Sequence, residues 1–243
     1  MIETKHLSFR YGKNLALNNV SLAFPVGFNV LLGPNGAGKS TLVSLLTHLA
    51  LPIQGDITFD GRPLNQDTAG IMANFGVVFQ QATLDLDLSV KQNLIYHGAL
   101  HGLSPAIVLA QSKPLIERLE LDKRLNDKVR SLNGGHRRRV EIVRALVHQP
   151  RFLLLDEPSV GLDNHSRNII INYIRELTDT MKLTVIWTTH LLDEIALDDQ
   201  LHILKQGEVI ASAELNTLLN EHQVSDVNQL YLKLTEAGAL NAI

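Results

Sequence analysis

The sequence predicts an α/β fold built on a parallel sheet that helices cover on both faces. Three short and almost continuously apolar runs, residues 28–32, 152–155 and 183–187, have the composition of parallel strands without a solvated face. Helical patterns of apolar residues separate these runs along the chain. This alternation of strands and helices is typical of α/β domains.

An antiparallel β-layer is expected near the amino terminus. Val20, Leu22 and Phe24 alternate with polar or small neighbours, and residues 57–59 repeat the alternation. A period of two indicates strands with one buried and one solvated face. The sheet type here therefore differs from that of the three apolar runs.

A helical subdomain is expected within the core. Strand patterns are absent between about residues 85 and 130, where helical patterns are interrupted at Gly102 and Pro105. The segment after Asn216 has the pattern of a polar, weakly helical tail. The predicted division is a core of residues 1–85 and 131–215, an inserted helical subdomain of residues 86–130 and a tail of residues 216–243.

Composition excludes several function classes. The 243 residues contain no cysteine, which rules out disulfides and thiolate metal sites. A net charge of −3 gives no general attraction to nucleic acid, so no nucleic-acid partner is expected. The sequence contains no apolar run of the roughly 18 residues that cross a bilayer, and its start lacks the pattern of a signal peptide. We therefore expect a cytoplasmic protein.

Residues 33–40, Gly-Pro-Asn-Gly-Ala-Gly-Lys-Ser, match the phosphate-binding loop pattern G-x-x-x-x-G-K-[ST] between a predicted strand and a predicted helix. The glycines let backbone N–H groups turn toward phosphate oxygens, Lys39 adds a positive charge, and the Ser40 hydroxyl can bind Mg²⁺. The sequence therefore predicts a nucleoside triphosphate site. Its expected residues are Gly33, Pro34, Asn35, Gly36, Ala37, Gly38, Lys39, Ser40 and Thr41.

Two adjacent carboxylates, Asp156 and Glu157, end the apolar run at residues 152–155. The carboxyl edge of a parallel sheet is where α/β folds bind ligands, so this pair is expected beside the phosphate-binding loop. Asp156 can hold Mg²⁺, and Glu157 can orient or deprotonate an attacking water.

Residues 132–136, Leu-Asn-Gly-Gly-His, precede a predicted helix that opens with Gly134 and Gly135. A Gly-Gly helix start presents N–H groups and the positive dipole end to an anion. Here the chain resembles the ATP-binding cassette (ABC) family, whose signature normally reads Leu-Ser-Gly-Gly-Gln. Asn133 and His136 depart from it. The resemblance implies a P-loop NTPase (RecA-like) core that carries the β-layer and the inserted helical subdomain.

Four further residues match family motifs in the family's order. Tyr11 resembles the aromatic residue that stacks on adenine, and Gln80 resembles the Q-loop glutamine that senses Mg²⁺ and the γ-phosphate, although Gln81 leaves its register open. Asp163 resembles the D-loop aspartate that reaches the other protomer. His190, after the run that ends in Thr-Thr, resembles the switch histidine at the γ-phosphate.

The resemblance implies a composite site in which two cassettes enclose two ATP molecules. The implied cofactors are ATP and Mg²⁺, with Ser40, Gln80 and Asp156 holding the metal. The implied partners are a second cassette protomer, identical or different, and separate transmembrane permease subunits that hold the cassette at the cytoplasmic face of the membrane. Residues 80–94, with His-Gly-Leu at residues 101–103, look most like the cassette subunits of exporters for drugs, polysaccharides or related amphiphiles, the ABC-2-type exporters. A non-transport ABC ATPase of cluster assembly or envelope signalling is the alternative.

Other interpretations have less support. The arginines at residues 137–139 can indicate nucleic-acid binding, but one basic run on a neutral chain is more often a solvated face. No histidine group has metal-ligand spacing, and the acidic pairs at 85/87 and 198/199 are expected to be solvated. This sequence lacks the Asn-Lys-x-Asp segment with which GTPases read the guanine base, so GTP specificity is disfavoured. A small-molecule P-loop kinase is also disfavoured, because it would not need the Asn-Gly-Gly helix start.

Overall fold

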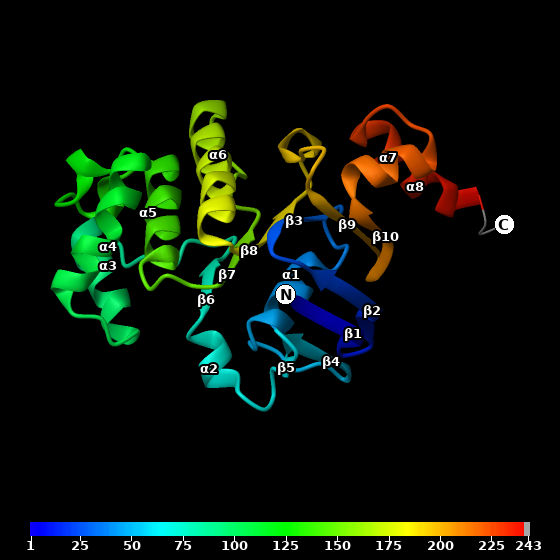
Figure 1. Ribbon diagram of the computed structural model, residues 1–243, viewed down its shortest axis with the longest axis horizontal. Coiled ribbons are helices and arrows are strands. Elements are labelled where there is room, and N and C mark those ends of the chain that lie inside the picture. Colours follow the sequence, from blue (N-terminus) through cyan, green and yellow to red (C-terminus); the bar gives the residue numbers. More distant parts are fainter. Residues whose placement is uncertain (241–243) are drawn as a thin grey trace. The chain divides into compact units, whose positions relative to one another are not determined.

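A computed structural model describes residues 1–240, with side chains described through residue 235 (Figure 1). The chain forms two compact units. The first contains Met1–Ile71 and the chain from Thr184 onward, and the second contains Met72–Leu183. In the described residues, no helix is both long and apolar enough to cross a membrane.

The first unit contains the expected antiparallel layer. Strands β1 (Ile2–Tyr11), β2 (Asn14–Phe24), β4 (Gln54–Phe59) and β5 (Arg62–Pro63) form a sheet in the order β2-β1-β4-β5. Ile2 lies opposite both Phe24 and Phe59, and all three side chains are buried. The alternating apolar positions of the sequence therefore lie on one buried face.

A second group of strands in this unit carries the phosphate-binding loop. Strand β3 (Gly27–Leu32) pairs in parallel with β8 (Thr184–Thr189) and with β9 (Gln200–Lys205). Strand β10 (Glu208–Glu214) pairs antiparallel with β9. Strand β8 is buried throughout, as its continuous apolar run predicts. The loop at residues 33–38 joins β3 to helix α1 (Lys39–Leu46).

Helices α7 (Leu215–His222) and α8 (Val227–Leu240) end the described chain. Leu215, Leu218 and Leu230 are buried in a core cluster with Val30 of β3 and Leu201 of β9. The helical character expected for this region is confirmed, but the region is not simply a polar tail, because its leucines recur with helical spacing and pack on the strands of the first unit.

The second unit contains two parallel strands, β6 (Phe75–Val78) and β7 (Phe152–Asp156), and most of the helices. Its longer helices are α3 (Val90–Leu100), α4 (Pro105–Arg118), α5 (Gly134–Leu146) and α6 (Asn164–Met181). The short helix α2 (Thr68–Met72) precedes β6, and 3₁₀ turns occur at Asp122–Arg124, Val129–Ser131 and, in the first unit, Leu192–Glu194.

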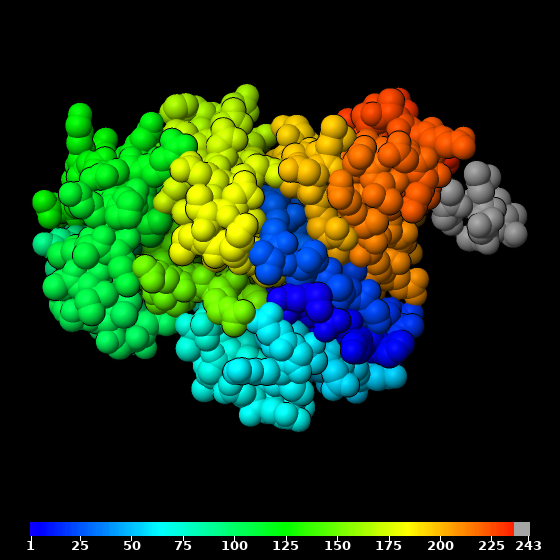
Figure 2. All heavy atoms as spheres, in the orientation of Figure 1, coloured from blue at the N-terminus to red at the C-terminus, as the bar shows by residue number. Residues whose placement is uncertain are grey.

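Local sequence signals explain where α3 and α4 begin. Ser89 and Gln92 form a reciprocal capping box at the start of α3, and Ser104 caps α4 just before its first residue, Pro105. A Cβ atom at Gly98 would lie 2.2 Å from Val108 Cγ2, so Gly98 is needed where the two helices pack closely. In Figure 2 the heavy atoms of residues 90–146, coloured blue-green to green, lie together on the face that is shown.

Candidate nucleotide site

The phosphate-binding loop is tightly packed at two of its glycines. A Cβ atom at Gly33 would lie 2.4 Å from the Leu204 carbonyl oxygen, and one at Gly38 would lie 2.7 Å from Leu17 Cδ2. Gly38 also has φ +107°, a conformation that L-residues rarely adopt. These contacts hold the backbone of the loop against β2 and the end of β9.

The start of α1 suits an anion. Gly38 is the N-cap residue, and no side chain caps the helix. The first N–H groups of a helix have no partner within the helix, and the positive dipole end adds attraction for phosphate. The exposed residues at the tip of the loop are Pro34, Asn35 and Gly36, whereas Ala37 and Thr41 are buried.

Lys39 supplies the charge at this loop. Its side chain is only 5% exposed, and its Nζ donates hydrogen bonds to the carbonyl oxygens of Gly33 at 2.6 Å and Pro34 at 3.3 Å. The ammonium group is therefore held against the loop backbone. Ser40, the next residue, is exposed and can offer its hydroxyl to a metal ion.

Two other predicted residues belong to the same unit as the loop. Tyr11 ends β1 and is 55% exposed, and its ring packs edge-to-face on Phe9 at 4.9 Å between centroids. His190 is exposed immediately after β8. The Gly33 N–H donates to the Thr189 carbonyl oxygen at 3.4 Å, so the first glycine of the loop adjoins the residue before His190.

The second unit brings Gln80 and Glu157 together. Gln80 Nε2 donates a hydrogen bond to Glu157 Oε2 at 3.1 Å, although the residues are 77 positions apart. Glu157 is 7% exposed and Asp156, at the end of β7, is 4% exposed. Glu157 also has φ +46°, in the left-handed region that few residues with a side chain adopt.

Arg138 anchors the segment that carries Gln80. Its guanidinium donates to the carbonyl oxygens of Phe79 at 2.7 Å and Gln80 at 3.0 Å, and to Glu141 Oε2 at 2.9 Å. Burial lowers the pKa of Arg138, and the charge of Glu141 opposes this shift. Sequence reasoning missed this role, for which the i,i+3 spacing of Arg138 and Glu141 on α5 was the available signal.

Asn133 caps α5 at the start of the Gly-Gly segment. Its Oδ1 accepts the His136 N–H at 2.8 Å. The Nδ2 donor of the same side chain is not used in this bond and lies on the other branch of the amide. Asn133 and Gly134 are both exposed. The helix start predicted to meet an anion is therefore accessible.

Asp163 caps α6 in the same way. It accepts hydrogen bonds from the Ser166 N–H at 2.8 Å and from the Ser166 hydroxyl at 3.1 Å. The N–H bond from Ser166 lowers the pKa of the Asp163 carboxyl. A Cβ atom at Gly135 would lie 2.7 Å from Ser166 Oγ, so Ser166 adjoins both the start of α5 and the cap of α6. No pattern along the chain predicts this link.

The interpretations of the triple arginine as a solvated or nucleic-acid-binding face are wrong. Arg138 and Arg139 are buried, and Arg139 pairs with Glu120 at 2.8 Å. Arg137 donates to the carbonyl oxygens of Val129 and Arg130. All three arginine side chains therefore bind backbone or side-chain groups within the second unit.

Two further expectations are also wrong. Asp199 is 1% exposed and accepts the Ala196 N–H at 2.7 Å, so only Asp198 of that pair is solvated. The expectation that no histidine group has metal-ligand spacing is wrong, since His97, His101 and His148 have ligand nitrogens within 4.8 Å of one another. His97 and His101 are four residues apart, a spacing that places two ligands on one helix face. The third histidine comes from a distant segment, which spacing along the chain cannot reveal.

Comparison with known proteins identifies the family. The family model described as ABC transporter matches residues 17–160, more than half of the chain. The chain belongs to the ABC transporter family. This cassette is 34% identical over 242 residues to the linearmycin resistance ATP-binding protein LnrL of Bacillus subtilis (strain 168), with 96% of the cassette and 78% of the relative covered. It is 36% identical over 232 residues to the Nod factor export ATP-binding protein I of Burkholderia orbicola (strain AU 1054), with 95% and 76% covered.

Solved structures agree with this assignment. The ABC cassette superposes on an ATP-binding subunit of an ABC transporter with a TM-score of 0.87 at 26% identity, covering 97% of this chain and 99% of the other. It matches a dimeric cassette in a post-hydrolysis state, bound to ADP and Pi, with a TM-score of 0.80 at 28% identity over 88% and 99% of the two chains. The chain is therefore an ATP-binding, ATP-hydrolysing ABC transporter subunit with the P-loop NTPase fold.

Proposed function

We propose that Glu157 is the general base of ATP hydrolysis in this cassette and that Gln80 orients it. The hydrogen bond from Gln80 Nε2 to Glu157 Oε2 is the observation that carries this proposal. Glu157 accepts that bond with its Oε2, and a carboxylate beside an attacking water can take a proton from it. The bond fixes the direction of the carboxylate, which a general base needs.

The nucleotide roles follow the chemistry of the loop. The backbone at Gly33–Ser40 and the Lys39 ammonium bind the phosphates, and Tyr11 stacks on the base with its exposed ring face. Ser40, Asp156 and Gln80 offer the oxygen ligands that Mg²⁺ prefers. When bound, Mg²⁺ neutralises charge on the phosphate oxygens. His190 donates a hydrogen bond to the terminal phosphate.

The functional form is proposed to be a dimer of cassettes. Asn133 and Gly134 are exposed at a helix start that favours negative charge, which supports a role toward a phosphate held by another protomer. Gly135 and Asp163 belong to the same proposed surface, because both adjoin Ser166. A related cassette solved as a dimer supports this arrangement.

Export is the proposed transport direction, with an amphiphilic molecule as cargo. The names of two relatives refer to linearmycin resistance and to Nod factor export, and both relatives are similar to this chain over most of its length. Separate permease subunits would select the cargo and hold this cassette at the cytoplasmic face of the membrane. The same similarity disfavours a non-transport ATPase of cluster assembly or envelope signalling.

Substitution of Gln80 tests the proposal. Gln80→Ala should lower the ATP turnover rate by about 10-fold or more while ATP still binds, because the carboxylate of Glu157 loses its orienting donor. The matched control is Gln81→Ala, which changes the exposed neighbour. Equal turnover in Gln80→Ala and wild type, or a loss confined to Gln81→Ala, would overturn the assignment of Gln80.

A further inference from the structure

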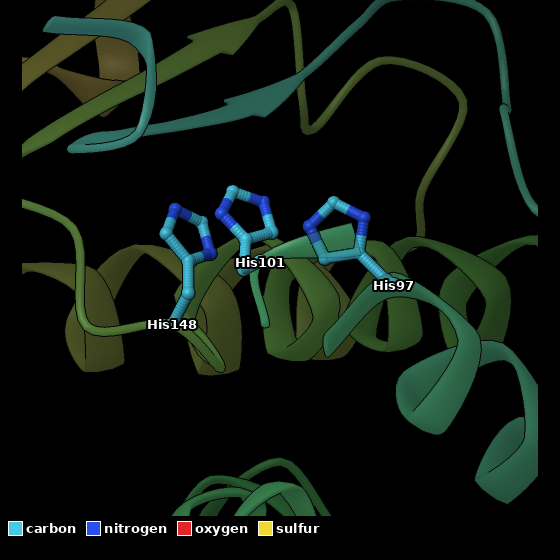
Figure 3. Close-up of side chains that lie close together, drawn as sticks. All are labelled: His97, His101 and His148. Carbon is cyan, nitrogen blue, oxygen red and sulfur yellow. The ribbon is translucent and has the colours of Figure 1, made fainter. Parts of the chain in front are cut away.

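Three histidines meet where α3 ends and where α5 leads into β7. His97 lies in the last turn of α3, His101 is the residue that ends the helix, and His148 lies between α5 and β7. The three side chains project in the same direction, with His101 between the other two (Figure 3). Ring centroids are 4.9 Å apart for His97 and His101, and 3.8 Å apart for His101 and His148.

The hydrogen bonding of His148 selects the tautomer of a metal ligand. Its Nε2 lies 3.1 Å from the Phe75 carbonyl oxygen, which can only accept a hydrogen bond. The proton is therefore on Nε2, and Nδ1 carries the lone pair. Metal-ligating histidines usually donate their other ring N–H to a carbonyl or carboxylate in this way.

Two buried nitrogens of the cluster are candidate ligand atoms. His148 Nδ1 and His97 Nε2 are both buried and have no hydrogen-bond partner among the described residues. Leaving a buried polar atom without a partner costs about 1–3 kcal/mol, so such atoms are rare in folded proteins. A metal ion would satisfy both lone pairs at once.

The electrostatics of the cluster favour neutral imidazoles. Burial, with further contributions from Arg144, His101 and His148, lowers the pKa of His97 to about 3. Burial, with the charge of His101 adding to it, lowers the pKa of His148 to about 4. The positive charge of Arg144 opposes a cation here, and Glu141 interacts favourably with Arg144 and offsets part of that charge.

We propose that His97, His101 and His148 form a binding site for a divalent transition metal of the Zn²⁺ class. Three imidazoles with no carboxylate or thiolate suit zinc, copper or nickel rather than Mg²⁺. The ligand nitrogens lie within 4.8 Å of one another, whereas ligands at the Zn–N distance of about 2.0–2.1 Å in a tetrahedral site are roughly 3.4 Å apart. Metal binding therefore requires the nitrogens to move closer together, and the nearly parallel rings of His101 and His148, 12° apart, to rotate until both lone pairs point at the ion. The bound metal would join the end of α3 to the segment before β7.

Calorimetric titration with Zn²⁺ tests the site. The sample is the full-length, tag-free chain, which is first treated with a chelator to remove metal and is kept free of nucleotide. We expect one Zn²⁺ per chain. Binding should be at least about 10-fold weaker in His101→Ala, because a site with three ligands loses most of its affinity when one ligand is removed. His222→Ala, at the end of α7, is the control and should bind Zn²⁺ like the wild type. Absence of saturable binding, or unchanged affinity in His101→Ala, would overturn the proposal.

Further variants distinguish loss of the metal site from loss of folding and from loss of the proposed Mg²⁺ ligands. His148→Asn retains an N–H donor for the Phe75 carbonyl oxygen but removes the imidazole, and it should also weaken Zn²⁺ binding. Asp156→Asn should leave it unchanged. Melting curves without metal check that each variant is folded. Visible absorption of bound Co²⁺ should show strong bands of a tetrahedral site in the wild type, and their persistence in both histidine variants would contradict the ligand assignment.

Discussion

At the scale of single residues, Asn133 combines two roles that substitution can separate. Its Oδ1 caps α5, and its amide group is proposed to donate to the phosphate held by a partner protomer. Asn133→Asp keeps a capping oxygen but replaces the amide donor with a negative charge. Asn133→Ser keeps both a capping oxygen and a donor, whereas Asn133→Ala removes both.

We expect Asn133→Ser to remain active and Asn133→Asp to lose ATP turnover without losing stability. Asn133→Ala should lose turnover and about 1 kcal/mol of unfolding free energy, the usual cost of a lost cap. Steady-state ATPase rates and chemical denaturation measure the two effects. Normal turnover in both Asn133→Asp and Asn133→Ala would show that this residue is only a helix cap.

His202 on β9 predicts a pH dependence of stability. The side chain is fully buried beside Phe24 and contacts the Ser212 hydroxyl, and burial lowers its pKa to about 4. As the pH falls, His202 in the unfolded chain binds a proton near the ordinary pKa of 6.5, whereas His202 in the folded chain does so only near pH 4. Stability from this group is therefore complete above about pH 6.5 and is lost as the pH falls toward 4.

Comparison with His202→Gln isolates this contribution. We expect the unfolding free energy of the wild type to fall by roughly 3 kcal/mol more than that of His202→Gln between pH 7 and pH 4. Urea denaturation at several pH values measures the difference. Identical pH profiles for the two proteins would contradict the neutral, buried state of His202.

At the scale of elements, α5 connects the Gly-Gly helix start to the segment that carries Gln80. Arg138 makes this connection through the Phe79 and Gln80 carbonyl oxygens, and it shares a buried ion pair with Glu141. Glu141 also accepts the Thr83 N–H at 2.9 Å. A displacement of α5 would therefore act directly on the backbone at Gln80.

Removing Arg138 alone should be costly for both stability and catalysis. Arg138→Met removes the ion-pair partner of the buried Glu141 and leaves Arg144 as a second nearby positive charge, so the cost should approach the roughly 3–5 kcal/mol typical of a broken buried pair. Adding Glu141→Gln should recover part of this stability, but turnover should stay low because the Gln80 segment remains unanchored. Thermal unfolding and ATPase assays on the single and double variants test this. Full recovery of turnover in the double variant would show that Arg138 acts only through Glu141.

Sequence patterns predicted the elements whose cause is local. The helical segment between about residues 85 and 130, the buried strand β8 and the loop at residues 33–40 follow from spacing and turn residues. Contacts between distant segments could not be read in this way, because the bond between Gln80 and Glu157 and the meeting of His148 with His97 depend on tertiary packing. Sequence order alone suggested that the arginines after Gly135 were exposed, whereas tertiary partners bury Arg138 and Arg139.

At the scale of the whole molecule, the cassette is expected to work as an ATP-dependent dimer. Each chain carries one phosphate-binding loop and one exposed Gly-Gly helix start, and the proposed composite site needs both from different protomers. Hydrolysis by Glu157 would then open the dimer and drive the permease. Lys39→Ala serves as a control for nucleotide binding, because it removes the positive charge at the loop.

The most direct test measures ATP turnover and ATP-dependent dimerisation of Glu157→Gln in the same preparation. Turnover should fall by about 100-fold or more because the general base is lost, while ATP still binds and holds the protein as a dimer. Lys39→Ala should form no such dimer. Hydrolysis at the wild-type rate by Glu157→Gln would contradict the role of Glu157, and a Glu157→Gln protein that stays monomeric with saturating ATP would contradict the composite site.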